Sequence, residues 1–338
     1  MSTALYDGAI RTCSLVDANS FVEQLFPDRS IFGPEPSWTL SQFWDAFHAA
    51  HPQAWSNFLA QLSRSNSKKG IEIFFNVLTG HNRVKSLGRS WSAANKDKPA
   101  GGDASRKPDL VCFNPMKGNK SDWSHFMSVG ELKSGDFKDV YELLVERVAL
   151  LFRNQDSRRF VLTFVLVKRS MTVALFDRGG SIVCDPFYIG KQPHLFLQFI
   201  LSLTFTPLTS LGYDSTISTH PADRTLSLLY ILNIRLLCVL YVAERSHGRG
   251  TVVWLAKLKD LATTKVPEFI ALHFGKSWSI DPAIIIKDIW TDENNSLTEG
   301  MILALLKMKG VLGVPRILAE EHVLSEPATD GMCQFVPH

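Results

Sequence analysis

Hydrophobic positions follow two different spacings along this chain, and the change between them divides the sequence. Up to about residue 80, apolar side chains recur three or four positions apart, which is typical of amphipathic helices. The clearest example runs through Ile71, Phe74 and Leu78 and stops at Gly80. We therefore predict that residues 1–80 form a mostly helical N-terminal region.

From residue 109 onward, short apolar runs rich in β-branched and aromatic side chains predict strands instead. The first four runs cover 109–113, 126–133, 160–167 and 172–176, and the last two predict a hairpin. An amphipathic pattern over 138–153 predicts a helix between the second and third strands, and 195–203 predicts another. This order predicts an α/β (α+β) domain with a mixed sheet over residues 81–215.

A second domain is predicted over residues 224–325. It contains apolar runs at 226–242 and 251–258, a linker over 259–281, a strand at 283–289, a helix over 296–309 and a further strand at 314–318. The stretch 225–242 is as apolar as a membrane span, but Arg235 lies near its middle, and a central arginine costs about 2.5–3.5 kcal/mol on insertion. We therefore expect two buried strands, or a strand and a short helix, and no membrane segment.

Composition indicates the cellular compartment of the protein more clearly than its function. The 36 basic and 33 acidic side chains nearly balance, which neither requires nor excludes nucleic acid. The five cysteines are widely spaced and form no C-x-x-C pair, so a disulfide framework or a cysteine-rich zinc site is not expected. The N-terminus carries no basic patch followed by an apolar run, as a signal peptide would. We expect an intracellular protein, nuclear or cytoplasmic.

Basic residues gather in one polar, glycine-rich stretch, which we predict to be a loop over residues 81–107. Residues 82–107 carry seven lysines and arginines against two acids. Such clusters are most often solvated loops, and they also suit the phosphates of a nucleic acid, because binding releases counterions. We expect nucleic acid, if it binds, to contact this stretch, and we keep a protein partner as the other option.

The strongest chemical signal is formed by Asp109, Glu131 and Lys133. Glu131 and Lys133 are two positions apart in a predicted strand and therefore share one face, and Asp109 begins the neighbouring strand. Carboxylate oxygens are ligands for Mg²⁺, and a nearby lysine can stabilise the charge that develops when a phosphodiester is cleaved. This acidic–acidic–lysine arrangement, with a helix following at once, resembles a restriction-endonuclease-like core with Asp109 and Glu131 as the metal ligands.

A fourth acidic residue in such a core usually comes from an upstream helix. Glu72 lies beside the apolar face of the helix predicted before residue 80, and Glu23 is the fallback. An ordinary surface carboxylate is the alternative for both. His48 and His51 could likewise share a helix face, but with no third ligand nearby in the sequence we expect them to be surface histidines.

A second set of residues lies in the second domain. Gly248 and Gly250 form a glycine turn ahead of an apolar strand, and glycine allows close approach to phosphates. Lys287 ends a later strand, and Glu299 begins the helix that follows it. A strand lysine paired with a helix glutamate is how protein kinases hold the α- and β-phosphates of ATP.

Both sets together resemble the fungal-type protein kinase family. Its members carry a PD…GELKS region with a hairpin ending in FDR, and here these are RKPDLVCF, SVGELKSG and RRFVLTFVLVKRSMTVALFDRGG. The segments HGRGTVVW, IIIKDIW and EGMILALLKMKGVLGVPRIL resemble that family's glycine turn, lysine strand and C-helix. The resemblance implies ATP as a ligand and Ser/Thr phosphotransfer for complete members, with Lys287 as the phosphate lysine and Glu299 as its partner.

The chain departs from the family after this point. Only 20 residues follow Leu318, and neither an H-R-D-type catalytic loop nor a D-F-G metal motif occurs. We therefore expect a partial kinase N-lobe that binds ATP weakly and has no independent kinase activity, in a truncated homologue that acts as a binding or regulatory module or as a remnant. The alternative is a Mg²⁺-dependent nuclease that uses Asp109, Glu131 and Lys133.

Overall fold

The computed structural model describes most, but not all, of the chain. The described residues are 13–27, 39–63, 68–81, 89–93, 99–102, 107–114, 122–133, 137–217, 225–228, 232–243, 250–258, 283–289, 297–315, 317 and 320. They form two compact units, the first built from residues up to Asp214 and the second from Ser215 onward. Each unit is described by itself.

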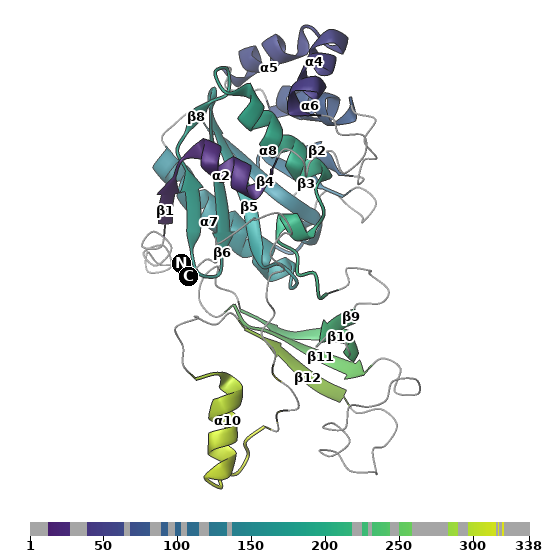
Figure 1. The fold of residues 1–338 in the computed structure, drawn as a ribbon, viewed down its shortest axis with the longest axis vertical. Coiled ribbons are helices and arrows are strands. Elements are labelled where there is room, and N and C mark those ends of the chain that lie inside the picture. The colour runs from purple at the N-terminus through teal and green to yellow at the C-terminus, as the bar shows by residue number, and fades with distance from the viewer. Residues whose placement is uncertain are drawn as a thin grey trace. The chain divides into compact units, whose positions relative to one another are not determined.

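An eight-stranded mixed sheet is the centre of the first unit (Figure 1). Its strands are β1 (Cys13–Val16), β2 (Ser90–Ser92), β3 (Leu110–Phe113), β4 (Phe126–Lys133), β5 (Phe160–Val167), β6 (Ser170–Asp177), β7 (Ser181–Cys184) and β8 (Phe187–Tyr188). The order is β1-β7-β6-β5-β4-β3-β2, with β8 beside β6. Strands β4 and β5 are parallel, as are β1 and β7, and the remaining neighbours are antiparallel.

Helices cover both faces of this sheet. They are α2 (Ala18–Leu25), α4 (Leu40–Ala50), α5 (Ala54–Leu62), α6 (Lys68–Gly80), α7 (Phe137–Asn154) and α8 (Pro193–Phe205), with short 3-10 turns η2 (Trp123–His125) and η3 (Thr209–Leu211). Helix α7 connects the parallel strands β4 and β5 and packs on one face, while the core cluster that contains α2, α4, α5, α6 and α8 covers the other.

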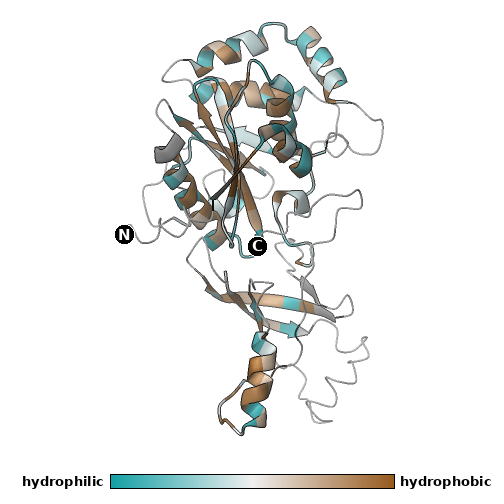
Figure 2. Ribbon diagram, turned by 60° about the vertical axis from the view of Figure 1, so that its left-hand side comes forward, coloured by the Kyte–Doolittle hydropathy of each residue, from teal (hydrophilic) through white to brown (hydrophobic). Residues whose placement is uncertain are grey.

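The sequence of β5 shows why the sheet is buried on both sides. Val161 and Val165 belong to the core under α7, whereas Leu162, Phe164 and Leu166 belong to the core under α8. A strand that is apolar on both faces needs a helix layer on each. Figure 2 shows the central strands coloured as hydrophobic between these layers.

A four-stranded antiparallel sheet forms the second unit, in the order β12-β11-β10-β9. The strands are β9 (Thr225–Leu228), β10 (Leu232–Val242), β11 (Val252–Leu258) and β12 (Ala283–Asp288), followed by helix α10 (Glu299–Met308). Its core is small and centres on Trp254, with Ile234, Leu236, Val252 and Ala256. Among the described residues, none of the α10 side chains is buried.

The predicted α/β class is confirmed, and so are most predicted elements. Strands β4 and β5 have the bounds that were predicted, and α6, α7, α8 and α10 lie where helical spacing placed them. The stretch 225–242 forms two strands, β9 and β10, rather than a strand and a helix. No helix within the described part of the chain is long and apolar enough to cross a membrane.

Four predictions need correction, and one lies outside the described residues. Residues 81–107 are not all loop, since β2 forms within them, and β1 interrupts the helical N-terminal region. In β10, the side chains of Leu237, Val239 and Tyr241 are exposed rather than buried. No strand forms at the described positions of 314–318, and the predicted linker 259–281 lies outside the described residues.

Candidate functional site

Strand pairing brings Asp109 and Glu131 to the same place in the first unit. In the antiparallel pair β3–β4, Leu110 lies opposite Gly130, so Asp109 comes level with Glu131. Glu131 lies on the sheet face under α7, because it pairs in register with Val165 of that core. The Oδ2 atom of Asp109 accepts a hydrogen bond of 2.9 Å from the N–H of Leu132, which fixes this carboxylate against β4.

Lys133 joins the two carboxylates. Its Nζ lies 3.1 Å from Glu131 Oε2 and 3.4 Å from Asp109 Oδ2. Glu131 is only 1% exposed, whereas Lys133 is 32% exposed and lies between the buried carboxylate and solvent. The structure thus brings together all three residues that the spacing of the sequence singled out.

Two further cations belong to this group, and the sequence did not identify them. Lys68, the first residue of α6, donates a hydrogen bond from Nζ to Asp109 Oδ1. Arg147 of α7 donates from Nε to Glu131 Oε1 at 3.2 Å and from Nη2 to the carbonyl oxygen of Lys107 at 3.4 Å. Arg147 was detectable in principle, since it interrupts the apolar face of α7 that holds Leu144 and Val148. We call these five residues, Lys68, Asp109, Glu131, Lys133 and Arg147, the ion network.

The pKa shifts follow from burial and from the charges within the ion network. Burial and the nearby charge of Asp109 raise the pKa of Glu131, against the opposing effects of Arg147 and Lys133. Burial also acts to raise the pKa of Asp109, but hydrogen bonds from Lys68 and Leu132 and the charge of Lys133 outweigh it, so the pKa is lowered. Burial acts to lower the pKa of Lys133, yet the two carboxylates outweigh it and raise the pKa.

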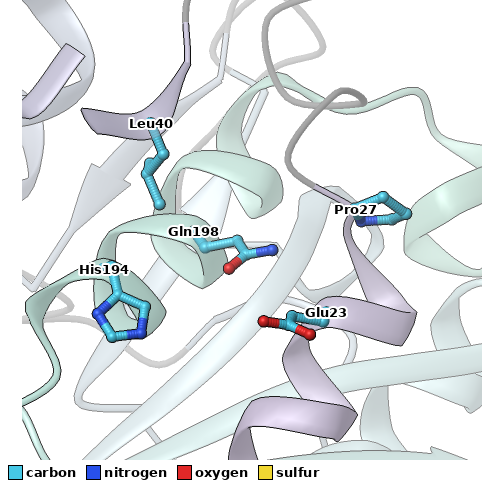
Figure 3. Close-up of a pocket in the computed structure, with 5 residues that line it drawn as sticks. All are labelled: Glu23, Pro27, Leu40, His194 and Gln198. Atoms are coloured by element: carbon cyan, nitrogen blue, oxygen red, sulfur yellow. The ribbon is translucent and has the colours of Figure 1, made fainter. Parts of the chain in front are cut away.

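Neither candidate for a fourth carboxylate contacts the ion network. Glu72 of α6 accepts hydrogen bonds from the N–H of Ala93 at 3.0 Å and from Lys69 Nζ at 2.7 Å, so it holds the end of β2. Glu23 of α2 lines a hollow of about 450 Å³, and Figure 3 shows its side chain among the residues that line this hollow. The other lining residues are Pro27, Leu40, His194 and Gln198.

A divalent metal does not fit the ion network as the structure places it. Each of the four carboxylate oxygens of Asp109 and Glu131 already meets a protein donor. Three cations face two carboxylates, whereas Mg²⁺ needs hard oxygen ligands that are free to bind it. Within the described ranges there is also no group of three or more His, Cys, Asp or Glu side chains that could hold a metal.

The second unit brings together the lysine and the glutamate expected there. Lys287 of β12 donates from Nζ to both carboxylate oxygens of Glu299, at 2.6 and 2.5 Å. Glu299 is held at the start of α10, where Thr298 caps the helix and Glu320 accepts hydrogen bonds from Thr298 Oγ1 and from the N–H of Gly300. The pair is open to solvent, with side chains 40% and 35% exposed.

The glycine turn lies at the same end of this sheet as the ion pair. Val252 pairs with Asp288 and Val253 with Lys287, so the β11 end nearest Gly250 adjoins the β12 end that carries Lys287. Gly250 has a positive φ of 48°, a conformation that glycine adopts more easily than other residues. Gly248 lies outside the described residues.

Only Arg89, Lys107 and the uncharged residues around them are described in the basic stretch 82–107. Arg89 is buried and donates from Nη1 to the carbonyl oxygen of Leu203 at 3.1 Å. Lys107 gives its carbonyl oxygen to Arg147. Arg89 is therefore a structural residue, and the remaining basic side chains of the stretch lie outside the described part.

Comparison with known proteins gives one match. A family model described as fungal protein kinase matches residues 107–336. This range contains four of the five residues of the ion network and all described residues of the second unit. No curated protein and no solved structure matches the chain.

Proposed function

This chain belongs to the fungal protein kinase family, and we propose that it acts as a nucleotide-binding or regulatory module without independent kinase activity. The observation that carries this proposal is the ion pair between Lys287 and Glu299. In protein kinases a strand lysine held by a helix glutamate is oriented toward the α- and β-phosphates of ATP. Lys287 is the residue that we expect to contact those phosphates here.

The surroundings of the ion pair support weak rather than tight binding. The ammonium of Lys287 is accessible, and the Gly250 turn at the same sheet end allows phosphates to approach the backbone. Both charged side chains are more than a third exposed, so water and salt screen their attraction for phosphate. A kinase cleft normally encloses the nucleotide from a second side as well, and small ligands bind tightly when most of their surface is buried.

Catalysis needs more than this ion pair. A phosphoryl acceptor must lose its proton to a base, and protein kinases supply that base and their metal ligands from H-R-D and D-F-G motifs. Neither motif occurs in this sequence after Glu299. The proposal therefore assigns nucleotide contact, and not phosphotransfer, to the 338 residues.

We expect Lys287→Ala to weaken ATP binding by about tenfold or more, because a hydrogen bond to a charged group contributes about 1.5–3 kcal/mol. The measurement is a titration of the whole chain with a fluorescent ATP analogue, displaced by ATP. Lys307→Ala is the matched control, since Lys307 is exposed and lies in the last turn of α10, the helix that begins with Glu299. Equal losses in the two variants, or no ATP binding by the wild type, would contradict the proposal.

One observation favours a second candidate function, a Mg²⁺-dependent nuclease. Asp109, Glu131 and Lys133 meet in space, as such chemistry requires. Against it stands the engagement of every carboxylate oxygen by a protein donor. The balance favours the nucleotide-binding proposal for the chain.

We accordingly expect purified wild-type protein to leave supercoiled DNA and single-stranded RNA intact in Mg²⁺ or Mn²⁺. The assay should include Glu131→Ala, Lys133→Ala and, as a control in the second unit, Lys309→Ala. Cleavage by the wild type and by Lys309→Ala that both other variants lose would establish the nuclease instead. Cleavage that is equal in all four proteins would come from a contaminant.

A further inference from the structure

The hollow beside Glu23 is separate from the ion network. Its volume is about 450 Å³, and none of the five residues of the ion network is among the described residues that line it. The lining comes from α4, α8 and the C-terminal end of α2, and α8 packs against both other helices. Pockets for small molecules in proteins measure about 300–1,000 Å³, so this hollow is large enough for a small ligand.

Gln198 of α8 is a buried polar residue of this lining. Its side chain is only 5% exposed, and its Nε2 donates a hydrogen bond of 2.6 Å to the carbonyl oxygen of Phe26, which fixes the amide. The Oε1 atom accepts no hydrogen bond from another described residue, and it is not enclosed by protein. Because buried amides are normally bonded through both of their polar groups, this oxygen is an acceptor for a donor within the hollow.

Glu23 gives the described lining its negative charge. Its side chain is exposed, and within the described part of the chain its carboxylate has no hydrogen bond or ion pair. Figure 3 shows this carboxylate and the side-chain oxygen of Gln198 directed toward the same part of the hollow. His194 adds an imidazole, while Pro27 and Leu40 add apolar surface. The lining thus combines a free carboxylate, a buried acceptor and an apolar wall.

We propose that this hollow binds a small organic amine. The ammonium group donates hydrogen bonds to Glu23 and Gln198, and the hydrocarbon part lies against Pro27 and Leu40. An ammonium has three donors and no acceptor, so it matches two acceptors that face the same space. The first turn of α8 favours anions, but the charge of Glu23 repels them from the hollow. The site is independent of the proposed nucleotide contact, which lies in the second unit.

The test is saturation-transfer NMR on the full chain with three probes of similar hydrocarbon length: n-butylammonium, n-butanol and butyrate. They carry a positive charge, no charge and a negative charge. We expect the wild type to bind n-butylammonium, and to bind the other two more weakly by about fivefold or more, because only the ammonium can both pair with Glu23 and donate to Gln198.

Two variants show where the amine binds. Glu23→Gln removes the charge but keeps the size of the side chain, and it should weaken n-butylammonium binding by about fivefold or more. Asp45→Asn is the matched control, because it removes an exposed carboxylate of α4 that does not line the hollow, and it should bind as the wild type does. Gln198→Met should also weaken binding, while circular dichroism confirms that it is folded.

Several results would overturn the inference. They are no n-butylammonium binding by the wild type, equal affinity in the wild type and Glu23→Gln, equal losses in Glu23→Gln and Asp45→Asn, and butyrate or n-butanol binding as tight as that of n-butylammonium. Full affinity in a folded Gln198→Met would overturn it as well. Should Gln198→Met fail to fold, Glu23→Gln decides by itself, since Glu23 is exposed.

Discussion

Replacing Arg147 by Met should destabilise the first unit by about 3 kcal/mol or more at neutral pH, because it removes one partner of a buried charge. Glu131 is almost fully buried, and Arg147 is the partner that reaches it from α7. Lys133 remains within 3.1 Å, but it lies toward solvent and also serves Asp109. The loss should appear as a lower midpoint in urea unfolding monitored by far-ultraviolet circular dichroism.

The destabilisation caused by Arg147→Met should depend on pH, and the raised pKa of Glu131 determines the direction of this dependence. Burial and Asp109 already raise this pKa, and loss of Arg147 raises it further. When the pKa of a carboxyl is raised in the folded state, the free energy of unfolding falls as the pH rises from the ordinary pKa of that carboxyl through the raised one. Arg147→Met should therefore be least harmful in mild acid and most harmful at neutral pH.

Two controls distinguish this effect from loss of packing. Arg153→Met changes an exposed arginine of the same helix and should alter stability by no more than about 0.5 kcal/mol. Glu131→Gln combined with Arg147→Met removes the buried charge and should recover a large part of the loss. A double variant that is as unstable as Arg147→Met alone would show that Arg147 acts through packing and not through its charge.

The sequence predicted the elements of the first unit because each is encoded locally. Continuous apolar runs mark β4 and β5, which are covered on both faces, and the helical spacing of α7 is regular. Strand β2 was missed because it has only three residues and lies within a polar, glycine-rich stretch. Strand β1 was missed because its four residues lie directly before α2, in a region whose apolar spacing is mostly helical.

Three of the five residues of the ion network, Asp109, Glu131 and Lys133, could be predicted in the same local way. Glu131 and Lys133 share a face because they are two positions apart in one strand. Lys68 and Arg147 both lie in helices. Lys68 is 41 residues from its partner Asp109 in sequence, and Arg147 is 16 residues from its partner Glu131. Such contacts depend on how helices pack on the sheet, and a single sequence holds no direct record of that packing.

In the second unit, too, one part of the structure could be predicted from the sequence and another part could not. The pairing of Lys287 with Glu299 could be predicted, because protein kinases pair a strand lysine with a glutamate of the helix that follows. Exposure could not be predicted, and the apolar residues of β10 were expected to be more deeply buried than they are. Leu240, Tyr241, Met308 and Leu312 are all exposed large hydrophobic side chains.

We expect this chain by itself to transfer no phosphate from ATP. A positioned general base contributes about 10²–10⁴-fold to a reaction rate, and the metal ligands of a kinase add to this by aligning the phosphates. Because the sequence supplies neither motif after Glu299, the rate of transfer from ATP by this chain alone should not exceed that of a protein-free blank. The ion pair of Lys287 with Glu299 is expected to persist all the same, since it is formed within the second unit.

Incorporation of labelled phosphate from ATP tests most directly whether this chain lacks independent kinase activity. Purified wild-type chain and Lys287→Ala are incubated with Mg²⁺ and generic protein substrates, and both are compared with a protein-free blank. Wild type, variant and blank are expected to give the same incorporation. Robust incorporation by the wild type that disappears in Lys287→Ala would contradict it, because another part of the chain would then have to supply the catalytic base.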